Sequence, residues 1–191
     1  MNQRFMLLLS VFLILLPTLT GATAGTDYTI KKDDHYSQPQ LVKRFEGTEL
    51  KFQAMFDESA KYTFDGANAV DQADTNKLFG FGDCGEKHTE NSARIGWRWY
   101  NGQLEAMAFT HKDGQFSFES LGPMEIGKPL DFSIQISSDK TKYIYKFGSK
   151  TVEMERGCTD SEAKGFMLKP YFGGNQKAPH DITIKIGYED K

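Results

Sequence analysis

Two stretches decide the fold: residues 50–56 read LKFQAMF and residues 130–136 read LDFSIQI. In both, apolar residues stand at every second position, and ITIKI at 182–186 repeats the pattern. Because successive side chains of a β-strand point to opposite faces, each stretch predicts a strand with one buried and one solvated face.

The rest of the chain continues this pattern. Further strands are predicted at 60–64, 77–82, 92–100, 103–111, 115–121, 141–147, 150–155 and 165–172. Asn101–Gly102 and Asp113–Gly114 are two-residue hairpin signals between such runs. No window from 41 to 191 keeps apolar residues at helical spacing over three turns, so we expect an all-β chain.

About eleven short strands at this spacing predict a sandwich or a barrel. A closed lipocalin-type barrel needs apolar residues on both faces of its strands, whereas most strands here keep a polar face. We therefore expect a two-sheet antiparallel β-sandwich of the jelly-roll, concanavalin A-like type. The predicted organisation is an N-terminal arm at 25–40, which is polar, and a single sandwich domain at 41–191.

Residues 1–24 have the pattern of a cleaved signal peptide. Arg4 precedes an apolar run at 5–16, and Ala22–Ala24 is an A-x-A cleavage site. The run is shorter than the roughly 18 residues of a membrane span, so we expect no membrane insertion. No cysteine stands near the cleavage site, which argues against a lipoprotein. The predicted location is the periplasm or the extracellular medium.

Charge and cysteine content narrow the possible partners. The net charge is −3, without a block of lysines and arginines, so nucleic acid is a poor candidate partner. Cys84 and Cys158 are the only cysteines, and an exported chain meets an oxidising compartment. We expect a disulfide that closes a loop of about 75 residues, worth about 4 kcal/mol in the chain-entropy model.

Two stretches carry a resemblance: NSARIGWRW at 91–99, and KPYFGGN at 169–175 leading to APHDI at 178–182. They resemble an uncharacterised family of exported Bacteroidetes-type proteins that are assigned to concanavalin A-like sandwiches. The resemblance implies export and, because this fold houses many lectins and polysaccharide enzymes, an association with glycans.

The strand at 92–100 supplies candidate ligand contacts. Alternation places Trp97 and Trp99 on one face, expected to be the core, and Arg94 and Arg98 on the other. A guanidinium binds carboxylate or sulfate well, so these arginines suit an anionic glycan. Glu105, on the hairpin partner, is either a further ligand contact or an ion-pair partner of an arginine.

His111, Tyr143 and Tyr145 complete the set of candidate ligand-binding residues. Asp181 is a candidate ligand of a structural calcium ion, although a carboxylate after Pro–His more often fixes the local turn. The four histidines are not paired at metal-binding spacing, and no other cofactor is predicted.

Three functions remain open. The sequence favours non-catalytic, lectin-like carbohydrate binding. A polysaccharide lyase is the enzyme alternative, because QIS at 135–137 and YFGG at 171–174 resemble alginate lyase segments; Ser137, however, replaces the catalytic histidine, and the lysine after Tyr–Phe is missing. The third is an envelope protein that binds a protein partner through a sheet edge.

Overall fold

The computed structural model describes residues 25–189. The predicted signal peptide at 1–24 lies outside the described residues. Within the described part of the chain, no helix is long and apolar enough to cross a membrane.

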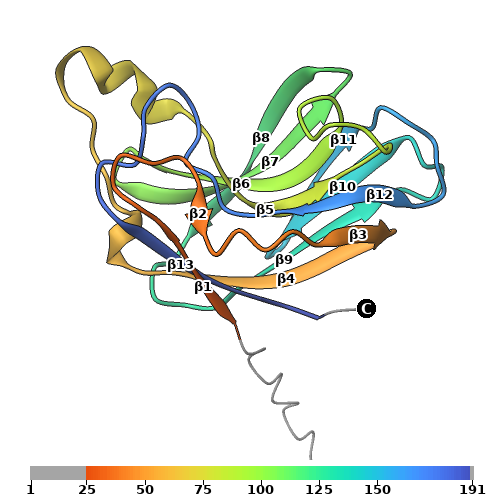
Figure 1. Cartoon of the computed structure of the whole chain (residues 1–191), viewed down its shortest axis with the longest axis horizontal. Coiled ribbons are helices and arrows are strands. Elements are labelled where there is room, and N and C mark those ends of the chain that lie inside the picture. The colour runs from red at the N-terminus through yellow and green to blue at the C-terminus, as the bar shows by residue number, and fades with distance from the viewer. Residues whose placement is uncertain (1–24, 190–191) are drawn as a thin grey trace, which may run out of the picture.

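Two antiparallel sheets face each other (Figure 1). The seven-stranded sheet has the order β11 (Lys150–Glu155), β10 (Lys142–Phe147), β9 (Leu130–Ile136), β4 (Glu49–Phe56), β13 (Ile182–Tyr188), β1 (Thr26–Ile30), β2 (Ser37–Gln38). The six-stranded sheet has the order β3 (Arg44–Gly47), β12 (Ala163–Leu168), β5 (Asn76–Gly82), β6 (Ser92–Tyr100), β7 (Gln103–Lys112), β8 (Gln115–Met124).

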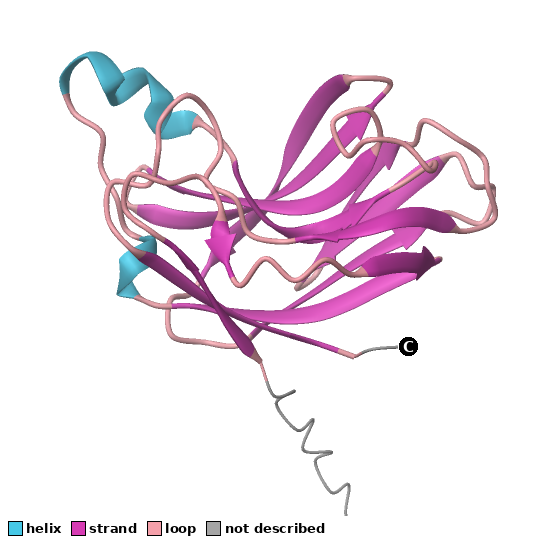
Figure 2. Cartoon of the chain, in the orientation of Figure 1, coloured by secondary structure: helices cyan, strands magenta, loops and turns pink. Residues whose placement is uncertain are grey.

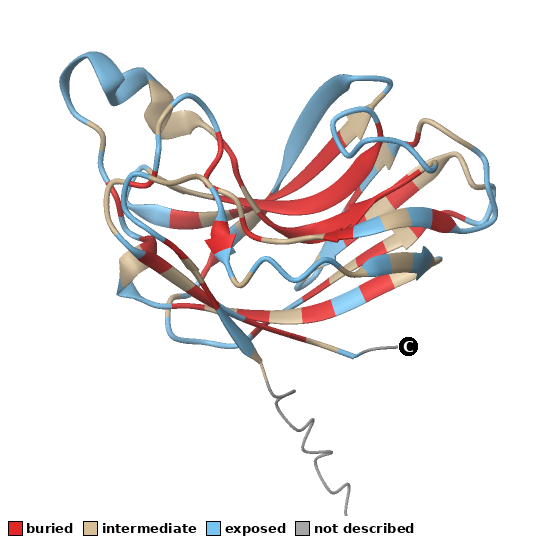
Figure 3. Cartoon of the chain, viewed as in Figure 1, coloured by how far each residue is buried: buried red, intermediate tan, exposed pale blue. Residues whose placement is uncertain are grey.

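The hydrophobic core lies between the sheets (Figure 3). The apolar positions of β4, Leu50, Phe52, Ala54 and Phe56, are all buried, as their alternation predicts. Because the core separates two distinct sheets, the all-β sandwich is confirmed and the lipocalin-type barrel does not form.

Every predicted strand except 60–64 is present, with shifts at some ends. Residues 61–65 are extended but unpaired, because the Gln72 side chain takes the place of a neighbouring strand: its Oε1 accepts from the Phe64 amide, and its Nε2 donates to the Tyr62 carbonyl. Gln72 belongs to the 3₁₀ segment η2 (Gly66–Ala73), which with η1 (Glu58–Ala60) supplies the helical turns that the sequence did not predict (Figure 2).

Residues 25–40, which we expected as an arm outside the sandwich, are part of it. All five residues of β1 pair with β13, and Tyr28 and Ile30 enter the core. The expectation was wrong because β1 is short and the polar run that follows it hides its alternation. β3 was missed as well, since its four residues end at Gly47.

The outer face of the six-stranded sheet, opposite the core, is the concave face. η2 rises on one side of this face and the β7–β8 hairpin on the other, so the sheet forms a shallow bowl between them (Figure 1). The side chains that β6 and β7 turn away from the core point into this bowl.

Candidate functional site

Arg94 lies on the concave face of β6. Ala93, Ile95 and Trp97 belong to the core, so alternation turns Arg94 away from it, as predicted. The side chain is nevertheless only 6% exposed. Burial lowers the pKa of Arg94 to about 10, so the guanidinium stays charged at neutral pH.

Strands β5 and β6 approach each other closely beside Arg94. Gly80 pairs with Arg94, and Gly82 pairs with Ser92. A Cβ atom on Gly80 would lie 2.1 Å from the Ala93 carbonyl oxygen, so only glycine fits there. The backbone of β6 therefore lies directly against β5 beside Arg94.

A hollow of about 320 Å³ lies next to Arg94. Four large apolar side chains that are exposed on the protein surface line it: Tyr36, Leu41, Val42 and Phe166. Tyr171 completes the wall and stacks on His35, with ring centroids 5.3 Å apart. The hollow thus combines apolar and aromatic walls with one buried cation, which is typical of ligand sites.

The Arg94 guanidinium has no anionic partner in the described chain. Its Nε is buried without a hydrogen-bond acceptor, and none of the ion pairs between residues 25 and 189 includes it. A buried charge without a partner costs free energy, and an anion bound at this point would remove that cost. Arg94 is the central residue of the candidate site.

Two further basic groups surround Arg94. The Lys77 ammonium donates to the Thr75 carbonyl at 2.8 Å and lies 4.4 Å above the Phe109 ring. Burial and the charge of Arg94 lower the pKa of Lys77 to about 8. Burial, and then Arg94 and Lys77, lower the pKa of His111 to about 4. These groups repel one another's protons, so their side of the concave face favours an anion.

Arg98 and Glu105 form an ion pair, with Nε and Oε2 2.8 Å apart. Arg98 also donates from Nη1 to the Ala73 carbonyl and lies over the Tyr100 ring. Of the two alternatives for Glu105, the structure shows the ion pair. Arg98 therefore anchors η2 to β6 and is less suited to a ligand than Arg94.

Gly96, between the two arginines, leaves no room for a ligand. The Thr75 methyl group fills this space, since a Cβ atom on Gly96 would lie 2.5 Å from it. Thr75 directly precedes β5, which pairs with β6.

His111 lies on the concave face as a candidate residue should. Its Nδ1 is 3.3 Å from the Ser92 hydroxyl, and its ring packs edge-on against Phe109 and Phe116. A pKa of about 4 keeps the ring neutral at neutral pH, so His111 contributes a polar edge rather than a charge.

Tyr143 and Tyr145 are not ligand-binding residues. Both are fully buried in the core between the sheets. The Tyr143 hydroxyl donates to Asp83 Oδ2 at 2.7 Å, and the Tyr145 hydroxyl donates to the Phe109 carbonyl at 3.1 Å. Their positions in the alternation of β10 point inward, so the chemistry of their hydroxyl groups serves the core.

Both carboxylate oxygens of Asp181, the candidate calcium ligand, accept hydrogen bonds from the turn after β1. One carboxylate oxygen accepts from Lys31 Nζ at 2.7 Å and the other from the Lys32 amide at 2.9 Å. These bonds fix the turn after β1 to the start of β13. Asp181 therefore stabilises a turn, as the sequence favoured. The turn is the one after β1, which is distant from Asp181 in the sequence.

The disulfide between Cys84 and Cys158 is confirmed, with Cα atoms 5.9 Å apart. Asp83, Cys84 and Cys158 form the one group of potential metal ligands in residues 25–189. Since both sulfurs are joined to each other, this group has no thiolate to offer a metal.

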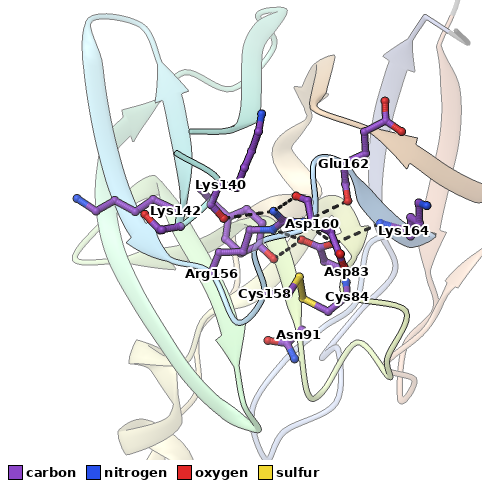
Figure 4. A network of polar contacts seen from close by, with 12 residues as sticks. Asp83, Cys84, Asn91, Lys140, Lys142, Arg156, Cys158, Asp160, Glu162 and Lys164 are labelled. Carbon is purple, nitrogen blue, oxygen red and sulfur yellow. Dashed lines mark hydrogen bonds and ion pairs between the residues drawn. A yellow bond between two sulfur atoms is a disulfide. The ribbon is translucent and has the colours of Figure 1, made fainter. Parts of the chain in front are cut away.

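Asp83 and Arg156 form a fully buried ion pair beside the disulfide (Figure 4). Arg156 Nε and Nη2 donate to the two Asp83 oxygens at 2.7 and 3.2 Å. The remaining Arg156 donors reach the carbonyls of Lys140, Asp160 and Glu162. Every donor of this guanidinium has an acceptor, so the cluster is structural. Arg94 differs, because its Nε has no acceptor.

A larger hollow of about 920 Å³ lies beside β3 and β4. Its rim carries both signs of charge, including Lys51, Glu49 and Lys146. None of the unpartnered buried polar atoms of the described residues lies in it. The smaller hollow at Arg94 is therefore the better candidate, despite its size.

Two exposed aromatic residues of the concave face were not predicted as site residues. Phe116 and Phe118 lie on β8, and the rings of both are nearly parallel to that of Phe109. The signal was present in the sequence, because a two-residue turn at Asp113–Gly114 pairs His111 with Phe116 and Phe109 with Phe118.

No protein-family model matches the chain, and no curated protein does. Among solved structures, a family 7 alginate lyase in complex with product is similar with a TM-score of 0.52 and 9% identity, over 86% of this chain and 80% of that chain. A carbohydrate-binding module from Bacillus subtilis is similar with a TM-score of 0.41 and 10% identity, over 89% of this chain and 94% of that chain. A pentraxin from Limulus polyphemus is similar with a TM-score of 0.43 and 11% identity, over 84% of this chain and 73% of that chain.

The likeness to the alginate lyase structure confirms the jelly-roll sandwich predicted from the sequence. At 9% identity it shows the fold alone. The lyase-like segments of the sequence are not brought together: Tyr171 lies beside Arg94, whereas Gln135 alternates with core residues of β9 and points outward from the other sheet.

Proposed function

We propose that this protein is an exported, non-catalytic carbohydrate-binding sandwich that recognises an anionic glycan on its concave face. One observation carries the proposal, namely the buried and charged guanidinium of Arg94, whose Nε has no hydrogen-bond acceptor and which lines an aromatic hollow. Planar carboxylate or sulfate groups match a guanidinium in shape and charge.

Non-catalytic binding fits the surroundings of Arg94 better than elimination does. A lyase needs a base near the sugar ring with a pKa close to the working pH. His111, with a pKa of about 4, is too weak for this role. Lys77 has a pKa of about 8, but its ammonium is held by the Thr75 carbonyl and the Phe109 ring. Gln135 lies on the other sheet. Export, and membership of the resembling Bacteroidetes-type family, are parts of the same proposal.

The test measures glycan binding by calorimetry at low and moderate salt. Polygalacturonate, alginate and heparin are the probes, and Arg94→Gln is compared with wild type. Because a charge-assisted hydrogen bond contributes about 1.5–3 kcal/mol, we expect Arg94→Gln to weaken binding roughly tenfold to hundredfold. The salt dependence should fall as well, since one charged contact is lost.

Lys146→Gln is the matched control, because it removes one exposed positive charge from the outer face of the seven-stranded sheet. Binding should be unchanged in this variant. If Lys146→Gln weakens binding and Arg94→Gln does not, the site lies at the larger hollow. Ultraviolet absorbance of an unsaturated product would show that the protein is a lyase and overturn the non-catalytic assignment.

Export has its own test. If the signal peptide is cleaved after Ala24, the mature protein recovered from the periplasm or medium begins at Gly25. Intact mass measurement identifies this terminus. A protein that keeps Met1 and stays in the cytoplasm contradicts the export prediction.

A further inference from the structure

A row of paired residues crosses the concave face from the Arg94 hollow to the free edge of the sheet. Gly80 of β5 pairs with Arg94 of β6, Arg94 with Phe109 of β7, and Phe109 with Phe118 of β8. Directly opposed residues of neighbouring strands share a face. Phe118 therefore lies on the same face as Arg94, two strand spacings or about 10 Å away.

The end of this row is an aromatic surface. Phe118 is 44% exposed and Phe116 is 63% exposed, although phenylalanine is normally buried. Both rings lie nearly parallel to the buried Phe109 ring, at interplanar angles of 2° and 8°. We name Phe109, Phe116 and Phe118 the aromatic strip. Figure 3 shows the exposed stretch of β8 that carries it.

The strip is continuous with the cationic site. Lys77 lies above the Phe109 ring, so positive charge extends from Arg94 to the first ring of the strip. Phe116 and Phe118 themselves carry no charge, and the alternate positions of β8, such as Ser117, point to the other face. A ligand that crosses the strands would meet an anion-binding group first and apolar rings next.

Building on the proposed function, we propose that the aromatic strip is a second sugar subsite. It takes the C–H face of a sugar farther along the same chain than the two residues that a disaccharide places at Arg94. The ligand is then an internal stretch of an acidic oligosaccharide that crosses β6, β7 and β8, rather than a single terminal sugar. Rigid aromatic rings supply contact area to such a face at little entropic cost.

The test compares a digalacturonate with a hexagalacturonate, because only the longer chain can span both subsites. The double variant Phe116→Ala/Phe118→Ala should lose about tenfold in affinity for the hexasaccharide and keep wild-type affinity for the disaccharide. Its salt dependence should equal that of wild type, since stacking is not screened. Phe118→Tyr should keep the affinity, and Ser117→Ala, on the other face of the same strand, is the control.

The two proposals fail in different ways. If Arg94→Gln weakens both oligosaccharides while the double variant keeps the wild-type ratio of hexasaccharide to disaccharide affinity, the second subsite is wrong and the proposed function stands. If wild type binds neither oligosaccharide nor heparin, both are wrong. If wild type is a dimer by light scattering and the double variant is a monomer, the strip is a contact between copies of this chain, and the subsite is overturned.

Discussion

Two buried arginines of this protein have opposite surroundings. Arg156 gives all its donors to Asp83 and to backbone carbonyls, whereas the Arg94 Nε has no acceptor. An arginine that serves the fold is normally satisfied within the fold. The difference separates a guanidinium whose donors all have acceptors from one whose Nε has none, and residue type alone could not have predicted it.

The Asp83–Arg156 pair should be essential for stability. Asp83→Asn leaves the Arg156 charge buried without its counterion and is expected to cost about 3–5 kcal/mol in the free energy of unfolding. The double variant Asp83→Asn/Arg156→Met should recover part of that loss, because no charge then remains unpaired. Urea unfolding of both variants measures this; equal stability of Asp83→Asn and wild type would contradict it.

His111 should make stability depend on pH. Its pKa is lowered from 6.5 to about 4 in the folded protein, so the unfolded chain binds a proton that the folded protein resists within this range. Stability should therefore fall as the pH falls from 6.5 toward 4, and this contribution should end below the folded pKa.

His111→Gln removes this contribution. Between pH 6.5 and 4 the urea midpoint of the variant should change less steeply than that of wild type. His88, whose pKa is lowered by burial and then by Arg94, remains in both proteins and contributes to the residual slope, as do carboxyl groups with a lowered pKa such as that of Asp139. Identical slopes would show that His111 is solvated and titrates normally.

At the scale of single elements, alternation predicted the long strands well and the short ones poorly. β4, β9 and β13 each bury alternate residues, and a shift by one position would expose all of them. β1 and β3 have too few residues to display a period. The η2 segment escaped prediction because it has no buried face and is held by Gln72 and Arg98.

Strand β6 provides a test of the predicted core face. Trp97 is fully buried, so Trp97→Ala should cost about 3–5 kcal/mol. Trp99 is only partly buried, and Lys61 covers its ring, so Trp99→Ala should cost about 1 kcal/mol. Trp97→Phe is the control that keeps most of the volume. Chemical denaturation measures the free energy of unfolding of each variant. Equal losses of stability in the two alanine variants would contradict the assignment of burial.

At the scale of the whole molecule, the disulfide ties together segments that are 74 residues apart. It joins the turn after β5 to the segment after β11, next to the Asp83–Arg156 pair. Replacing both cysteines with serine should lower the free energy of unfolding by about 4 kcal/mol, mainly by freeing the unfolded chain. In urea unfolding, wild type with a reductant should lose as much stability as the double serine variant does without one. A reduced wild type as stable as the oxidised protein would contradict this prediction.

The residue pairs in the middle of the concave face follow from the sequence alone. The turns at Asn101–Gly102 and Asp113–Gly114 allow one register each, and this register already pairs Arg98 with Glu105 and Arg94 with Phe109 and then Phe118. Hairpin pairing is local, so turn chemistry and alternation suffice to predict it.

Which arginine of β6 lacks a partner depends on the tertiary fold. Arg94 is buried because β5, β12 and the segment at 36–42 meet around it, and these segments are far from β6 or from one another in the sequence. The tertiary structure also brought Ala73 to Arg98 and buried Tyr143 and Tyr145. Burial and pairing of a side chain are set by all the elements that pack against it, and no periodicity within a single strand encodes them.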